Sequence, residues 1–118
     1  MDFQVSLTPQ AERDLERIGR HIARDNVQAA RTFCGQLMLE AKSLKSLPRR
    51  GFTVRRQPKI RRLVFKTYLI FYKIFEDEGR VEILRFWHSK RDQGRLRLKE
   101  EVSPAYALSP DTAPAIAS

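Results

Sequence analysis

Cysteine is almost absent from this sequence, and so are other features that mark common protein classes. A single cysteine, Cys34, excludes an intrachain disulfide and a four-cysteine zinc site. It falls among apolar residues at helical spacing, so we expect it to fill the core. No apolar run is long enough to span a membrane, and no signal peptide is visible at the N-terminus. We therefore expect a cytoplasmic protein without membrane contact.

Motifs of metal and cofactor enzymes are equally missing. The chain has no glycine-rich phosphate loop, no HExxH pattern and no GxSxG nucleophile motif. Its two histidines, His21 and His88, are far apart in the sequence and bring no further metal ligands with them. The sequence thus predicts neither a metal site nor a cofactor.

Acidic residues are few relative to basic ones. The 118 residues include 23 Lys and Arg against 14 Asp and Glu, which gives a net charge of +9. All lysines and arginines precede Glu100, so the first hundred residues are more basic than the total suggests. A positive field of this kind favours an acidic partner, which could be RNA, DNA or an acidic protein.

The first half of the chain has the pattern of one strand followed by two helices. Alternating apolar residues predict a strand over FQVSLT, and Thr8-Pro9 predicts a helix start with an N-cap followed by proline. Asp25-Asn26 can cap a second helix, which should end by Pro48. Apolar residues recur at spacings of three or four in both helices: Ala11, Leu15, Ile18 and Ile22, then Ala30, Phe33, Leu37, Ala41 and Leu44. These stripes predict a helical hairpin.

The second half changes to residues that favour strands. Residues 49–59, RRGFTVRRQPK, are predicted to form a basic loop. Segments near 60–66, 68–75 and 80–87 are rich in Ile, Val, Phe and Tyr, which predicts three strands. The EDEGR stretch between the last two is a turn signal, because Gly79 can adopt positive φ.

This element order predicts an α+β domain over residues 1–99. We expect the helical hairpin to cover one face of a single twisted sheet that contains a three-stranded antiparallel segment. The opposite face of the sheet should be polar and basic. Residues 100–118 are rich in Pro, Ala and Ser and nearly uncharged, so we predict a flexible tail.

The stretch RFWHSKRD, at residues 85–92, gathers the candidate functional side chains. RNA cleavage without a metal needs an acid and a base that work near neutral pH, and cations that hold the phosphate. Histidine and arginine supply these groups. A nuclease hypothesis names four residues: His88, Arg61, Arg85 and Arg91. Strict alternation, however, puts Arg85 and His88 on opposite sides of their strand, which argues against cooperation between them.

A binding surface without catalysis is the alternative, and it requires no catalytic residue. Protein interfaces favour Trp and Arg, and the basic residues suit an acidic partner. The binding hypothesis names six residues: Arg61, Arg62, Trp87, His88, Lys90 and Arg91.

Four short motifs follow one another along the second half of the chain. They are Arg62-Leu63, Tyr68-x-Ile70-x-Tyr72, Val81-x-Ile83-Leu84 and His88-x-x-Arg91-Asp92. With the opening strand and helical hairpin, this ordered set resembles the ParE-type toxins of the RelE/ParE superfamily, from bacterial type II toxin–antitoxin modules. The likeness covers roughly residues 3–95.

The resemblance implies a growth-inhibiting toxin of the plasmid-stabilisation type, which a cognate ParD-like antitoxin neutralises in a hetero-oligomer. ParE-type members poison DNA gyrase, whereas RelE-type members cut messenger RNA on the ribosome. The HxxRD ending resembles the ParE branch and favours a gyrase inhibitor that is not itself an enzyme. The alternative is a ribosome-dependent mRNA endoribonuclease that uses His88, although Ser89 and Lys90 follow it where such relatives have an aromatic residue.

Overall fold

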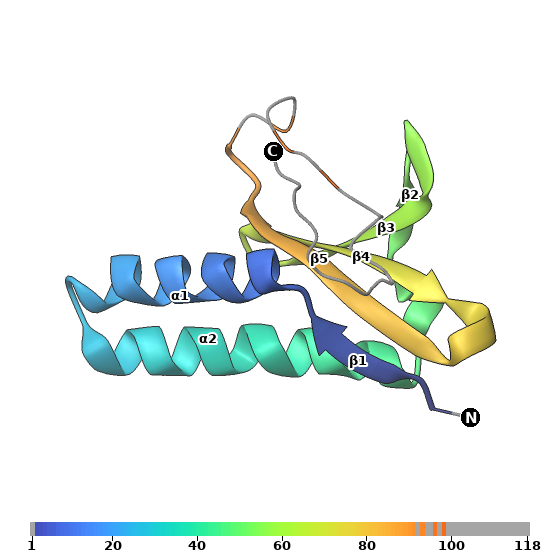
Figure 1. Cartoon of the computed structure of the whole chain (residues 1–118). Helices are drawn as coiled ribbons and strands as arrows, with labels where there is room; N and C mark the ends of the chain where they lie inside the picture. Colours follow the sequence, from blue (N-terminus) through green and yellow to red (C-terminus); the bar gives the residue numbers. More distant parts are fainter. Residues whose placement is uncertain (1, 92, 94–95, 97, 99–118) are drawn as a thin grey trace.

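Two helices lie against a five-stranded sheet, in the order that the sequence predicts but with one additional strand (Figure 1). The computed structural model describes residues 2–91, 93, 96 and 98. In chain order the elements are β1 (Gln4–Leu7), α1 (Pro9–Ala23), α2 (Val27–Lys42), the 3₁₀ helices η1 (Ser43–Lys45) and η2 (Pro48–Arg50), β2 (Phe52–Val54), β3 (Gln57–Phe65), β4 (Tyr68–Phe75), the 3₁₀ helix η3 (Glu76–Glu78) and β5 (Arg80–His88). Asp92 and the predicted tail, residues 100–118, lie outside the described residues.

Both predicted helix starts are confirmed. The Thr8 hydroxyl accepts a hydrogen bond from the Ala11 amide at 3.1 Å, with proline at the first position of α1. The Asn26 side chain accepts one from the Ala29 amide at 2.9 Å. Each cap satisfies an amide that has no partner inside its helix. Within the described part of the chain, no helix is long and apolar enough to cross a membrane.

The sheet has the order β1-β5-β4-β3-β2. Strand β1 runs parallel to β5, and the other three pairs are antiparallel. Gly79 turns the chain between β4 and β5 with φ of 62°, as predicted, because a residue without Cβ adopts this conformation at little cost. The sheet thereby places the C-terminal end of β5, which carries the candidate residues, beside the turn between β3 and β4.

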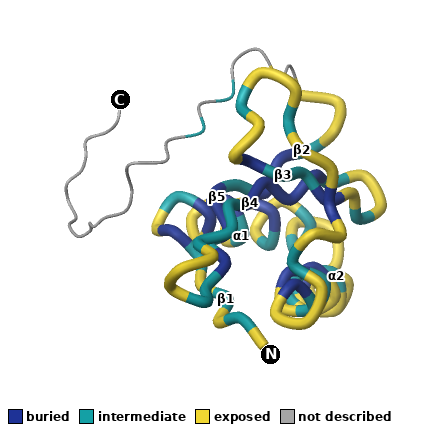
Figure 2. Tube along the Cα trace, turned by 90° about the vertical axis from the view of Figure 1, so that its right-hand side faces the viewer, coloured by how far each residue is buried: buried dark blue, intermediate teal, exposed yellow. Residues whose placement is uncertain are grey.

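The main core lies between the two helices and one face of the sheet (Figure 2). Apolar positions of both predicted helical stripes enter it, with Cys34 packed half-buried at its margin. Burial raises the pKa of the Cys34 thiol, which suits a packing role better than a nucleophilic one. Its buried members are Ala11, Ile18, Leu37, Ala41, Leu44, Leu63, Ile70, Tyr72, Val81, Ile83 and Phe86.

The prediction of a loop over residues 49–59 was wrong. Residues 52–54 form β2, which pairs with β3, and β3 begins at Gln57. Strand β2 was not predicted because the basic side chains around it break the apolar alternation on which strand prediction depends. The β2–β3 hairpin therefore forms one edge of the sheet, with its tip at Arg55 and Arg56.

The expected polar and basic character of the opposite sheet face was also wrong in its centre. A second apolar cluster lies there, with Leu96 and Leu98 packed against it. Its buried members are Ile60, Leu69, Phe71, Leu84 and Trp87. Trp87 is thus 3% exposed, in the core of this cluster and not on an open surface.

Candidate functional site

A buried ion pair fixes Arg85, one of the four nuclease candidates. The Asp14 carboxylate on α1 accepts two hydrogen bonds from the Arg85 guanidinium, from Nε at 2.6 Å and from Nη2 at 2.9 Å. It also accepts the Phe86 amide at 3.1 Å. Asp14 is 1% exposed, and its oxygens are satisfied by these donors and by Arg17 at 3.3 Å. The arrangement ties α1 to β5 and occupies the face of Arg85 that would otherwise hold a phosphate.

A bulge in β5 lies directly before Arg85. Phe71 pairs with Arg85 and Tyr72 pairs with Ile83, so Leu84 has no counterpart on β4. The extra residue interrupts the alternation of sides. The Arg85 guanidinium reaches Asp14 on α1 and also lies 5.1 Å from the centre of the Trp87 ring.

Arg61 is held by the backbone near the base of the β2–β3 hairpin. Its Nη1 donates to the Gly51 carbonyl at 2.7 Å and to the Arg49 carbonyl at 3.3 Å. Arg61 pairs with Tyr72, whose side chain lies in the main core on the helix side of the sheet. Arg62, the next residue, lies on the other side of β3 and donates to Gln93 at 3.5 Å. The two arginines thus belong to different faces.

Tyr72 binds the segment before β2, residues 48–51, from inside the core. Its hydroxyl donates to the Pro48 carbonyl at 2.6 Å and accepts from the Gly51 amide at 2.9 Å. Burial raises the pKa of the Tyr72 phenol, so it remains a neutral donor at physiological pH. A Cβ added to Gly51 would lie 2.7 Å from the Arg62 carbonyl oxygen and 2.8 Å from the Tyr72 hydroxyl, so this position admits only glycine without a shift.

His88 lies at the end of an aromatic row on the helix side of the sheet. Its ring meets the Tyr68 ring edge-on with centroids 5.0 Å apart, and Tyr68 lies 5.5 Å from Phe33 on α2. The Lys90 amide donates to His88 Nδ1 at 3.1 Å. This bond fixes the ring orientation and leaves Nε2 as the ring nitrogen that carries the proton in the neutral form.

Trp87 and Arg91 form a unit on the opposite face. The indole Nε1 donates to the Arg91 carbonyl at 3.3 Å, and the Arg91 guanidinium carbon lies 3.8 Å from the centre of the Trp87 ring. Lys90 and Arg91 are exposed. The predicted binding residues are therefore split, with His88 on the helix side of the sheet and Trp87 beneath Arg91 on the other.

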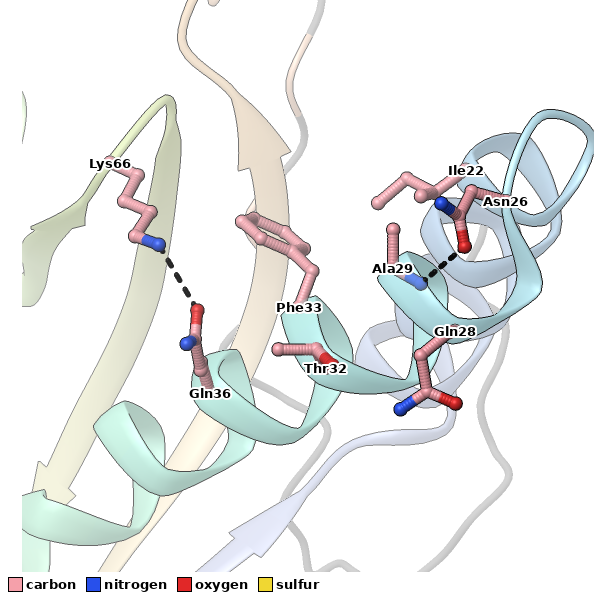
Figure 3. A pocket seen from close by; sticks show the side chains of 8 residues that line it. All are labelled: Ile22, Asn26, Gln28, Ala29, Thr32, Phe33, Gln36 and Lys66. Atoms are coloured by element: carbon pink, nitrogen blue, oxygen red, sulfur yellow. Dashed lines mark hydrogen bonds between the residues drawn. The ribbon is translucent and has the colours of Figure 1, made fainter.

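A groove of about 560 Å³ runs between the helical hairpin and the β3–β4 turn (Figure 3). Phe33 lies in it and connects it to the aromatic row that ends at His88. Lys66 closes one end by donating to Gln36 at 3.1 Å. The groove is lined by Ile22, Asn26, Gln28, Ala29, Thr32, Phe33, Gln36 and Lys66.

The four nuclease candidates do not form one cluster, although Arg85 and Arg91 both lie against the Trp87 ring, 5.1 and 3.8 Å from its centre. Arg85 is bound to Asp14, Arg61 is bound to backbone carbonyls, and His88 lies at the end of the aromatic row. Among the residues that the structure describes, no cluster of three or more His, Cys, Asp or Glu could hold a metal ion. The geometry offers a groove and separate basic surfaces, which suit binding.

A family model described as the ParE toxin of the type II toxin–antitoxin system parDE matches residues 5–93, well over half of the chain. The chain belongs to the ParE toxin family. It is therefore a toxin of a type II toxin–antitoxin system. No curated protein gives a significant sequence match.

Solved toxin structures share the fold of this ParE-family chain. The toxin–antitoxin complex RelBE2 from Mycobacterium tuberculosis has a chain that is 25% identical, with a TM-score of 0.59 over 75% of this chain and 99% of that one. A chromosomal ParDE system from P. aeruginosa has a TM-score of 0.65 at 17% identity, over 75% and 97% of the two chains. A doubly substituted E. coli RelE in the free state has a TM-score of 0.58 at 14% identity, over 76% and 86%. Similarity to both ParE and RelE structures establishes the fold but leaves the target undetermined.

Two residues that shape this ParE-family site, Asp14 and Gly51, were missing from the sequence-based candidates. Asp14 stands three residues after Ala11 and four before Ile18, inside an apolar stripe, and a carboxylate at such a position signals a buried partner. For Gly51 no local pattern exists, because the close contact comes from Tyr72 and Arg62 on other strands.

Proposed function

We propose that this toxin inhibits DNA gyrase and is neutralised by a cognate antitoxin. The observation that carries the proposal is the scattering of the nuclease candidates: the Arg85 guanidinium is held by the buried Asp14, Arg61 donates to the Gly51 and Arg49 carbonyls, and His88 lies at the end of the aromatic row. Acid–base cleavage of RNA needs its groups within hydrogen-bond reach of one phosphate. A toxin that acts by binding has no such requirement, and the ParE family match is in keeping with it.

Messenger RNA cleavage is the second candidate, and one feature favours it. His88 is half-buried beside exposed cations, and Nε2 has no hydrogen-bond partner among the described residues. An accessible ring nitrogen beside cations is the arrangement that an acid or base acting on a phosphate requires. This hypothesis predicts that the His88 side chain is essential.

A supercoiling assay with purified gyrase and the full-length toxin, freed from any antitoxin, tests the proposal. We expect loss of supercoiling and accumulation of cleaved DNA. Full supercoiling at saturating, folded toxin would reject gyrase as the target.

The His88→Ala variant separates the two candidates. Under the gyrase proposal neither the wild type nor His88→Ala cleaves mRNA on the ribosome, and His21→Ala, a change at an exposed histidine of α1, is the matched control. Ribosome-dependent mRNA cleavage that His88→Ala abolishes, and His21→Ala does not, would establish the nuclease function instead.

The antitoxin partner is proposed from charge and shape. An amphipathic segment would place apolar residues in the groove beside the helical hairpin, and acidic residues would meet the basic residues 49–62. Arg62→Glu should weaken the complex, more strongly at low salt, because exposed charges are screened by ions. Charge reversal at Arg61 should also disturb the loop, since Arg61 donates to the Gly51 carbonyl. An affinity that is independent of salt would contradict this contact.

A further inference from the structure

The middle of the chain is basic without interruption. Residues 41–75 contain eleven Lys and Arg and no Asp or Glu. Several of these cations are engaged within the protein: Arg49 pairs with Glu76, Arg50 pairs with Glu40, and Arg61 donates to backbone carbonyls. Those side chains serve the fold, so the question is which cations remain available to a ligand.

Three exposed cations lie together at the tip of the β2–β3 hairpin, whereas two others in this stretch, Lys42 and Lys45, lie at the end of α2 and in η1. Arg55, Arg56 and Lys59 are exposed, and none of them makes an ion pair or side-chain hydrogen bond within the described part of the chain. The nearest carboxylates along the chain are at Glu40 and Glu76. The tip therefore concentrates positive charge, and none of its three cations forms an ion pair with the residues that the structure describes.

The tip also extends beyond the rest of the sheet. Pairing with β4 begins at Ile60 of β3, so Gln57–Lys59 pair with no described strand on that side. Only Val54 of β2 pairs in this part, with Gln57. Figures 1 and 2 show the hairpin rising from the sheet on the side away from α1 and α2. A short two-stranded projection with three free cations results.

We propose that the hairpin tip, residues 54–59, binds the phosphate backbone of duplex DNA. Arginine presents a planar fork of donors that matches two phosphate oxygens, and two adjacent arginines with a lysine can reach neighbouring phosphates. The major groove of B-DNA, roughly 12 Å wide, admits a two-stranded β-ribbon. Such contacts supply affinity without reading sequence.

Within the basic residues 49–62, the composition of the tip at residues 54–59 favours duplex DNA over an acidic protein, which leaves the other basic residues of that stretch for the proposed antitoxin contact. Stable protein interfaces have an apolar or aromatic centre. The exposed large apolar side chains nearest to the tip, Phe52 and Val64, lie before it on β2 and after it on β3, and residues 54–59 contribute none. Single-stranded nucleic acid would likewise require an aromatic stacking surface at the tip. A duplex needs only the cations. The inference is independent of the proposed gyrase target, because it is tested without gyrase.

Binding of the full-length toxin, freed from antitoxin, to a fluorescent 20-base-pair duplex tests the inference by anisotropy across a salt series. The double variant Arg55→Gln/Arg56→Gln should bind about 50-fold more weakly near 0.1 M salt, and the slope of log K against log salt should fall by about 2, since each phosphate contact contributes about 0.9. Arg24→Gln/Arg31→Gln, at exposed positions of the helical hairpin, removes the same charge elsewhere. It should change affinity less than about threefold.

Several outcomes would overturn the inference. Equal losses in the two double variants would assign binding to the overall charge, and no measurable binding of the wild type would exclude DNA. Tighter binding of a single strand than of the duplex would reject the groove geometry. A tip variant that keeps DNA affinity but loses antitoxin affinity would assign the tip to an acidic protein. Lys59→Gln provides a second variant, with an expected slope change of about 1.

Discussion

Two arginine-containing regions of this toxin differ in what satisfies the charge. At the contact of α1 with β5, the Arg85 side chain is 13% exposed and shares two hydrogen bonds with Asp14. At the tip of the β2–β3 hairpin, Arg55 and Arg56 are exposed and have no partner in the described part of the chain. Each of these arginines contributes equally to the net charge of +9. Their surroundings assign the first to the fold and leave the second available for a ligand.

Removal of the Asp14 carboxylate should produce the largest loss of stability. Asp14→Ala leaves Arg85 buried without a counter-charge and the Phe86 amide without an acceptor. Breaking a buried pair in this way costs about 3–5 kcal/mol, a large part of the stability of a small domain. Urea unfolding followed by circular dichroism measures the loss.

Arg17→Ala is the matched control for this change. Arg17 contacts the same carboxylate at 3.3 Å, but its side chain is 54% exposed. An exposed ion pair contributes about 0–1 kcal/mol, so the loss should be small. The double variant Asp14→Leu/Arg85→Met should recover much of the stability, because an apolar pair of similar volume avoids the cost of burying charge. Equal losses for Asp14→Ala and Arg17→Ala would contradict a buried, cooperative pair.

Tyr72→Phe should have the next largest effect, at the base of the hairpin. The change removes one hydroxyl but leaves the Gly51 amide and the Pro48 carbonyl without their partner. Unsatisfied groups of this kind cost about 1–3 kcal/mol. Tyr68→Phe is the control, because the Tyr68 hydroxyl makes no hydrogen bond to the described residues, and it should stay within about 0.5 kcal/mol of the wild type. If Tyr72 stabilises the protein only by packing, Tyr72→Phe and Tyr68→Phe should have equal free energies of unfolding.

Sequence periodicity predicted the parts of this fold that depend on local chemistry. The helix caps at Thr8 and Asn26, the turn at Gly79 and the α+β class are confirmed, because each follows from residues close together in the chain. The short strand β2 was missed, since its basic and polar neighbours conceal the alternation. The apolar cluster around Trp87 was missed as well, because it joins residues from three strands.

The candidate site was harder to predict because its residues gain their roles from distant partners. Arg85 gains its structural role from Asp14, which lies 71 residues earlier, and it stands next to a bulge at Leu84. Alternation along one strand cannot reveal a bulge that both strands create. The predicted binding roles of Lys90 and Arg91 remain predictions, and both side chains are exposed.

Glu82 on β5 is a buried carboxylate that contrasts with Asp14. Its Oε1 is buried and has no hydrogen-bond partner among the described residues, while Oε2 lies 3.5 Å from Arg80. Burial raises the pKa of Glu82, against the opposing effect of Arg80 and Lys73. A raised folded-state pKa means that the fold favours the protonated form. The contribution of Glu82 to stability is therefore full below the ordinary glutamate pKa and is lost as pH rises through the folded-state pKa.

Glu82→Gln should consequently stabilise the protein at pH 7, by about 0.5 kcal/mol or roughly 2–4 °C in Tm. The advantage should shrink toward pH 4 and vanish roughly one unit lower, below the ordinary glutamate pKa of about 4.3, where the wild-type carboxyl is protonated in both states. Thermal unfolding from pH 4 to 7 measures the difference between variant and wild type. Glu78→Gln, at an exposed partner of Arg80, should show no such trend, and a destabilised Glu82→Gln at pH 7 would mean that the Arg80 contact outweighs burial.

The hairpin tip should show the smallest effect on stability, and this sharpens the contrast with Arg85. Arg55→Gln/Arg56→Gln removes no contact within the described chain, so unfolding should change by less than about 0.5 kcal/mol. The loss of two neighbouring like charges can even stabilise slightly, because the tip carries no acid to balance them. Urea unfolding of this variant beside Arg24→Gln/Arg31→Gln gives the comparison. A loss of stability as large as that of Asp14→Ala would show that the tip arginines make contacts that stabilise the fold. They would then not be free to bind phosphate.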